Sequence, residues 1–120
     1  MDLRLVIIDD NEVFLTAVRN LLEGEGMSVL AVATNAAAGL ALVEAERPDL
    51  VVVDIHLGPD DGFDVAERIA ALPDPPPVVL TSSHAATDLG DVLERSSAVA
   101  FLTKSRLSAG ALGQCYRRTR

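Results

Sequence analysis

The stretch Leu50-Val51-Val52-Val53-Asp54 is an apolar run that ends on a carboxylate. Three other short apolar runs end on polar residues, namely Asp9-Asp10, Thr81-Ser82 and Thr103-Lys104. Apolar runs without polar alternation are typical of strands that are covered on both faces of a parallel sheet. The carboxyl ends of parallel strands meet along one edge, where open α/β sheets bind ligands. We therefore expect these polar residues to converge on one small site.

The whole chain alternates apolar runs with amphipathic segments five times, which is typical of an α/β fold with a parallel sheet. The 120 residues have no linker, repeat or low-complexity tract, so we expect one domain over residues 1–120. The predicted strands are residues 3–8, 28–33, 50–54, 77–81 and 98–102. The predicted helices are residues 11–23, 35–46, 63–72, 85–95 and 106–118.

Apolar residues at helical spacing predict which side of three helices is buried. In the last helix this pattern makes Cys115 a small core residue rather than a reactive thiol. The predicted buried residues are Phe14, Ala17, Val18, Leu21 and Leu22 in the first helix, Phe63, Ala66, Ile69 and Ala70 in the third, and Leu107, Ala111, Leu112 and Cys115 in the last.

Composition excludes several classes of protein. The net charge of −8 opposes direct binding to nucleic acid or anionic membranes, and the basic cluster Arg117, Arg118 and Arg120 is expected to be a solvated helix end. No apolar run approaches the ~20 residues of a membrane span, and the start of the chain does not resemble a signal peptide. A single cysteine fits a reducing compartment, so we expect a cytoplasmic protein, and the composition is typical of a bacterial genome rich in G and C.

The acid pair Asp9-Asp10 follows one strand and precedes a helix. Two adjacent negative charges need a neutralising partner, and Mg²⁺ or Mn²⁺ with oxygen ligands would provide it. The alternative is helix capping by Asp10 or Asn11, but capping requires only one of these residues. We favour metal binding.

Asp54 is the candidate nucleophile. A carboxylate beside a metal can attack a phosphoryl donor, and such a transfer depends mostly on positioning and charge neutralisation. Lys104 would then supply a positive charge to one phosphoryl oxygen, and Ser82 a hydrogen bond to another.

These motifs together resemble the receiver domain of response regulators in two-component signalling, over essentially the whole chain. The matching stretches are Val6 to Asp10, Asp54 with Gly62 eight positions later, Val78 to Ser82, and Phe101 to Lys104. The resemblance implies a flavodoxin-like, doubly wound (βα)5 fold with a five-stranded parallel sheet in the order 2-1-3-4-5.

The resemblance also implies a role for each matching residue. Asp54 would take the phosphoryl group from a histidine kinase, a phosphotransfer protein or a small acyl phosphate. Asp9 and Asp10 would hold Mg²⁺ together with Asp54 and the backbone carbonyl of His56. Lys104 would pair with the acyl phosphate. The switch would consist of the Ser82 hydroxyl and the Phe101 ring.

The sequence leaves open a choice between two hydroxyls, and it departs from the family pattern at two positions. Ser82 lies five residues after Pro77, as the switch hydroxyl of the family does, and we prefer it to Thr81. The family usually has proline where this chain has Gly58, which suggests a looser loop. It usually also has proline after the lysine, where this chain has Ser105, so the Lys104–Ser105 bond is either trans or a strained cis bond.

The two histidines lie where the family tunes the lifetime of the acyl phosphate. His56 is two residues after Asp54, and His84 is two residues after Ser82. We expect this pair to shield or orient water, with two functionless loop histidines as the alternative. Gly90 falls in the predicted fourth helix and is expected to weaken it.

The preferred function is a phosphorylation-controlled switch that repacks the fourth helix, fifth strand and fifth helix, through which a homodimer could also form. We expect it to act through a downstream protein, or as the receiver part of a longer DNA-binding regulator. A receiver-like interaction module without phosphorylation is the alternative. A separate enzyme activity is not expected, since an aspartate phosphatase needs a second acid where this chain has His56. A flavin carrier is disfavoured because the acids of the first turn would repel phosphate.

Overall fold

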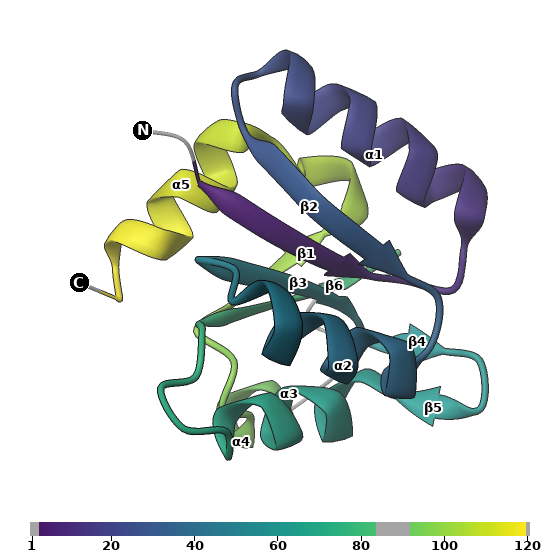
Figure 1. The fold of residues 1–120 in the computed structure, drawn as a ribbon, viewed down its shortest axis with the longest axis vertical. Helices are drawn as coiled ribbons and strands as arrows, with labels where there is room; N and C mark the ends of the chain where they lie inside the picture. The colour runs from purple at the N-terminus through teal and green to yellow at the C-terminus, as the bar shows by residue number, and fades with distance from the viewer. Residues whose placement is uncertain (1–2, 84–91, 120) are drawn as a thin grey trace.

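The computed structural model describes residues 3–83 and 92–119, with a five-stranded parallel sheet at its centre (Figure 1). The spatial order of the strands is β2-β1-β3-β6-β7. It equals the expected order 2-1-3-4-5, because two short strands between β3 and β6 lie outside this sheet. The strands are β1 (Arg4–Ile8), β2 (Ser28–Ala33), β3 (Leu50–Asp54), β6 (Val78–Ser82) and β7 (Ala100–Thr103).

Helices cover both faces of the sheet (Figure 1). Helices α1 (Glu12–Gly24) and α5 (Ala109–Arg117) lie on one face. Helices α2 (Ala36–Glu46), α3 (Gly62–Ala70) and α4 (Val92–Arg95) lie on the other. This double cover explains why the central strands are apolar between Leu5 and Ile8 in β1 and between Leu50 and Val53 in β3. None of the described helices is long and apolar enough to span a lipid bilayer.

The core consists of two clusters, one on each face, and alternation along the strands assigns side chains to them. Ile7 and Val52 belong to the cluster under α1 and α5, whereas Ile8 and Val53 belong to the cluster under α2 and α3. Cys115 is 1% exposed in the first cluster, so the prediction that it is a core residue is confirmed.

Three predictions about the helices need correction. In α1 the buried residues are Leu15, Val18 and Leu22, while Ala17 and Leu21 are exposed, so the helix is rotated relative to the predicted face. In α3 Ala70 is exposed and Val65 is buried instead. Helix α5 begins at Ala109, after a cap by Ser108, because residues 104–106 form the separate 3-10 helix η2 (Lys104–Arg106). The prediction about Gly90 lies outside the described residues.

Candidate functional site

Three acids meet at the carboxyl edge of the sheet, as the sequence predicts. Asp9 follows β1, Asp10 comes next, and Asp54 is the last residue of β3. One carboxylate oxygen from each lies within 4.8 Å of the others. Asp9 and Asp54 are only 1% and 4% exposed, whereas Asp10 is exposed. The neighbouring strands β1 and β3 therefore place two buried carboxylates and one exposed carboxylate around one point.

Lys104 joins the acids from the end of β7. Its Nζ lies 2.7 Å from Asp9 Oδ2 and 3.4 Å from Asp54 Oδ2, and its side chain is 16% exposed. Lys104 is the only lysine of the chain. One ammonium therefore pairs with two of the three carboxylates, and the cluster keeps an excess of negative charge.

The pKa of Asp54 is raised above its ordinary value. Burial of the carboxyl is the largest cause and the charge of Asp9 is the second. Lys104 and a hydrogen bond from the backbone N–H of His56 lower the same pKa in part. Another positive charge at this point would favour the ionised, nucleophilic form of Asp54.

The N-cap of α1 is Asn11 rather than one of the clustered acids. Asn11 is the N-cap of α1, because its side chain accepts a hydrogen bond of 3.0 Å from the N–H of Phe14. Asp9 Oδ1 accepts the N–H of Asn11 at 2.8 Å. Asp10 is therefore not needed as the cap, which removes the alternative explanation for the acid pair.

The acid cluster fits a hard divalent cation. Asp9 Oδ2 is buried and accepts no hydrogen bond, although Lys104 is nearby as an ion-pair partner. A carboxylate oxygen can bind a second partner besides the Lys104 ammonium, and Mg²⁺ prefers carboxylate oxygen ligands. Asp9, Asp10 and Asp54 are therefore the candidate metal ligands in the described part of the chain.

An unpredicted hairpin borders the site. Strands β4 (His56–Leu57) and β5 (Asp60–Asp61) pair antiparallel around the two-residue loop Gly58-Pro59. Gly58 has a φ of 68°, as the first loop position of a type II′ turn requires, and proline cannot adopt this angle. The structure thus gives this loop a defined turn, and its greater looseness relative to the family pattern stays a prediction. This turn lies beside Asp10, since a Cβ on Gly58 would be 3.5 Å from Asp10 Oδ2.

The two candidate hydroxyls lie at the end of β6, and both residues are buried. Thr81 pairs with Asp54 in the sheet, and its hydroxyl donates a long hydrogen bond of 3.5 Å to the carbonyl of Val53. Ser82 pairs with Thr103, the residue before Lys104. Strand alternation thus places Thr81 on the sheet face of Asp54 and Ser82 on the opposite face.

The remaining predicted residues lie near the same edge of the sheet or outside the described residues. Phe101 is partly buried in β7 and packs against the core cluster under α2 and α3. His56 is exposed in β4. His84 lies outside the described residues. The described peptide bonds include no cis bond, so the Lys104–Ser105 bond is trans.

Sequence reasoning assigned Phe14 only to the core and missed its contact with the site. The Nζ of Lys104 lies 4.3 Å from the centroid of the Phe14 ring, within the range of a cation–π interaction. The two residues are 90 positions apart and come from different elements, so no local pattern could reveal the contact.

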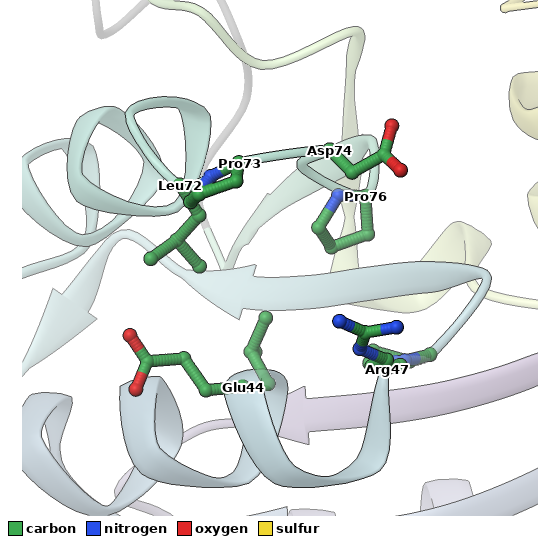
Figure 2. Close-up of a pocket in the computed structure, with 8 residues that line it drawn as sticks. Glu44, Arg47, Leu72, Pro73, Asp74 and Pro76 are labelled. Atoms are coloured by element: carbon green, nitrogen blue, oxygen red, sulfur yellow. The ribbon is translucent and has the colours of Figure 1, made fainter.

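A cavity of about 420 Å³ lies at the opposite, amino-terminal edge of the sheet (Figure 2). It opens between the end of α2 and the loop that leads from α3 to β6. Its charged lining residues are Glu44, Arg47 and Asp74, with prolines around them. No residue of the acid cluster lines this cavity, so it is separate from the candidate site.

Comparison with known proteins gives a consistent result. Residues 5–112 match a family model described as the response regulator receiver domain. A protein-glutamate methylesterase/protein-glutamine glutaminase 2 from Anaeromyxobacter dehalogenans is 36% identical over an alignment of 109 positions that covers 83% of this chain and 32% of that protein. The alginate biosynthesis transcriptional regulatory protein AlgB from Pseudomonas aeruginosa is 34% identical over 101 residues, which are 84% of this chain and 22% of AlgB. The chain thus spans less than a third of the length of these relatives.

Solved structures match over nearly the whole chain. The signal receiver domain of NarL from Mycobacterium tuberculosis superposes with a TM-score of 0.83 and 27% identity, covering 97% of both chains. The signal receiver domain of a modulated diguanylate cyclase from Desulfovibrio desulfuricans G20 has a TM-score of 0.81 and 26% identity, covering 98% of this chain and 93% of that one.

Proposed function

Because this chain belongs to the response regulator receiver domain family, we propose that Asp54 is its phosphoacceptor. The observation that carries the proposal is the approach of Lys104 to both Asp9 and Asp54 within a cluster of three acids. Asp54 differs from Asp9 and Asp10 in two ways. It is the last residue of the central strand β3, and its carboxylate accepts a hydrogen bond from the backbone N–H of His56. These contacts hold the carboxylate at the edge of the sheet.

In the proposed reaction an oxygen of the ionised Asp54 carboxylate attacks the phosphorus of a histidine kinase's phosphohistidine or of a small acyl phosphate. A new O–P bond forms, and the bond from phosphorus to the donor nitrogen or oxygen breaks, with its electron pair leaving on the donor. Lys104 stabilises the negative charge on the phosphoryl oxygens. Since Lys104 already lies 3.4 Å from Asp54, little rearrangement is needed for this contact.

Asp9, Asp10, Asp54 and the backbone carbonyl of His56 would hold Mg²⁺ or Mn²⁺. When bound, the dication would offset the charge of the carboxylates and of the incoming phosphoryl oxygens. The three carboxylates around one point, with Lys104 as their ion-pair partner, support this proposal. Burial raises the pKa of Asp54, so a second cation beside Lys104 would also increase its ionised fraction.

We propose Ser82 as the switch hydroxyl, coupled to Phe101. Ser82 keeps the family spacing from Pro77, and alternation places it on the sheet face against which Phe101 packs. A cavity of about 210 Å³, lined in part by Leu80, Leu93 and Phe101, lies between β6, β7 and α4 and offers room for the ring to move. The pairing of Thr81 with Asp54 keeps Thr81 as the rival hydroxyl.

Matched variants distinguish these two hydroxyls. Ser82→Ala is expected to be phosphorylated but to lose most of the NMR shift changes that phosphorylation causes around Phe101. Thr81→Val, which keeps the shape of the buried side chain, is expected to retain them. The opposite result would transfer the switch role to Thr81.

The exposed His56 and the unplaced His84 keep their proposed role in tuning the lifetime of the phosphoryl group. We also propose that residues 1–120 are one cytoplasmic receiver domain that takes its phosphoryl group from a histidine kinase or phosphotransfer protein. Output would pass through the α4–β7–α5 surface to a protein target, to a second copy, or to a DNA-binding domain of a longer regulator. Both named relatives are three or more times as long as their match, which supports a longer protein, and AlgB, a transcriptional regulatory protein, supports the arrangement with a DNA-binding domain.

Acetyl phosphate tests the phosphoacceptor. We expect a Mg²⁺-dependent band shift on a phosphate-affinity gel that disappears in Asp54→Asn. Asp64→Asn, an exposed acid of α3, is the matched control and should shift like the wild type. A shift that persists in Asp54→Asn, or that needs no divalent cation, would contradict the proposal. The absence of any shift, with acetyl phosphate and with phosphoramidate, would favour the interaction module.

A further inference from the structure

Four residues form a closed circuit of contacts around the site. Asp9 Oδ1 accepts the N–H of Asn11, and Asn11 Oδ1 accepts the N–H of Phe14. The Phe14 ring contacts the ammonium of Lys104, which lies 2.7 Å from Asp9 Oδ2. From this circuit we infer that Phe14 is a positioning residue, whose ring fixes the ammonium of Lys104 beside Asp54. The inference rests on the proposed function of the site.

Lys104 needs such a positioning group. Its four-carbon side chain has many rotamers, and a lysine ammonium has no fixed hydrogen-bond geometry of its own. Asp9 attracts the ammonium at 2.7 Å, more closely than Asp54 does at 3.4 Å. The two acids alone would leave the ammonium free to move around them. A ring at 4.3 Å adds a third contact, which restricts Nζ to the place where a phosphoryl oxygen on Asp54 would be reached.

The first turn of α1 holds Phe14 in place. Its backbone N–H is fixed by the Asn11 cap, and Asn11 is itself tied to Asp9. The side chain is partly buried and packs on the edge of the core cluster under α1 and α5. Ordinary core packing would need only an apolar side chain here, whereas the proposed role needs an aromatic face. Leucine and phenylalanine analogues therefore separate the two explanations.

A spectroscopic signature tests the contact in the unphosphorylated protein. Because Lys104 is the only lysine, labelling of lysine gives one NMR signal from its ε-methylene group. The ring current of Phe14 is expected to shift this signal upfield, and the shift should disappear in Phe14→Leu and persist in Phe14→Tyr. An unshifted signal in the wild type would overturn the inference whether or not Asp54 is phosphorylated.

Phosphorylation kinetics test the consequence. We expect the rate with acetyl phosphate to fall about three- to tenfold in Phe14→Leu, which corresponds to the usual strength of a cation–π contact. Replacement of Phe14 by mono-, di- and pentafluorophenylalanine keeps the shape of the ring and should lower the rate in that order. Phe14→Tyr keeps an aromatic face and should react at the wild-type rate. Val13→Ala, a change of the adjacent and 82% exposed residue, is the control and should leave the rate unchanged.

The outcomes separate this inference from the proposed function. If the wild type is phosphorylated on Asp54 and all Phe14 variants react equally fast, Phe14 is only a packing residue and the inference fails. If Phe14→Tyr is slowed as much as Phe14→Leu and the pentafluoro variant, the lower rate reflects disturbed packing, and the inference also fails. If the wild type is not phosphorylated at all, the proposed function fails, and the NMR signature still decides the contact.

Discussion

Asp54 carries its charge in a place that disfavours it. Burial and the neighbouring charge of Asp9 raise its pKa, and Lys104 offsets only part of this effect. An acid with a raised pKa in the folded state binds its proton more tightly there than in the unfolded chain. Ionisation of Asp54 therefore destabilises the metal-free fold, and this cost disappears as the pH falls through the raised pKa.

We accordingly expect Asp54→Asn to increase the free energy of unfolding of the metal-free protein at pH 7. The gain should shrink as the pH falls and Asp54 of the wild type becomes protonated, and vanish once it is fully protonated. Urea unfolding at a series of pH values, with chelator present, measures the difference. Asp64→Asn is the control, since its exposed salt bridge to Arg68 contributes little. A variant less stable than the wild type at pH 7 would refute this reasoning.

At the residue scale, the sequence predicted the acids and the lysine because each ends a recognisable apolar run. Asp9, Asp54 and Lys104 come together in the structure as the topology requires. The contact of Phe14 with Lys104 could not be predicted in this way. Helical periodicity identifies which residues share a side of α1, but not which distant side chain that side meets.

At the scale of elements, the β4–β5 hairpin was missed because its two-residue strands are too short for an apolar pattern. Its position is nevertheless fixed by close packing. The N–H of Gly62 donates to the carbonyl of Ile55 at 2.9 Å. A Cβ on Gly62 would clash with the backbone carbonyl of Asp54 and lie 2.7 Å from Ile55 Cα. Glycine at this position thus lets the start of α3 pack directly on Asp54.

Gly62→Ala is therefore expected to lower the free energy of unfolding by about 2 kcal/mol or more, because the new methyl group meets backbone atoms that cannot turn aside. It should also slow phosphorylation by displacing Asp54. Gly24→Ala is the matched control, since a Cβ there has open space, and we expect it to be neutral or slightly stabilising. Chemical denaturation of both variants checks the prediction, and similar stabilities would contradict it.

Element boundaries were predictable to within a few residues where hydrophobic periodicity is strong. The predicted start of the last helix was less accurate, since α5 begins at Ala109, three residues after the predicted start. Residues 104–106 form a 3-10 turn before Leu107, which is buried although it lies outside α5. Local propensity cannot distinguish such a turn from the first turn of a helix, because tertiary packing of Leu107 decides it.

At the scale of the whole molecule, the parallel sheet brings distant parts of the sequence together. The ends of β1, β3, β6 and β7 supply the acids, the hydroxyls and the lysine, while α1 supplies the ring over that lysine. The site therefore depends on the strand order rather than on any single segment. Strand β6 lies between β3, which ends at Asp54, and β7, which contains Phe101. Only one strand therefore separates Asp54 from the strand of Phe101, which packs against the same core cluster as Leu93 of α4.

The most direct test of the central claim is to locate the phosphoryl group. The protein is phosphorylated with acetyl phosphate and Mg²⁺, the acyl phosphate is reduced with borohydride, and the modified peptide is identified by mass spectrometry. We predict modification of Asp54 alone, at a level that falls to background without Mg²⁺. Modification of Asp9 or Asp10 in place of Asp54, or an unmodified Asp54 in protein shown to carry phosphate, would contradict the account.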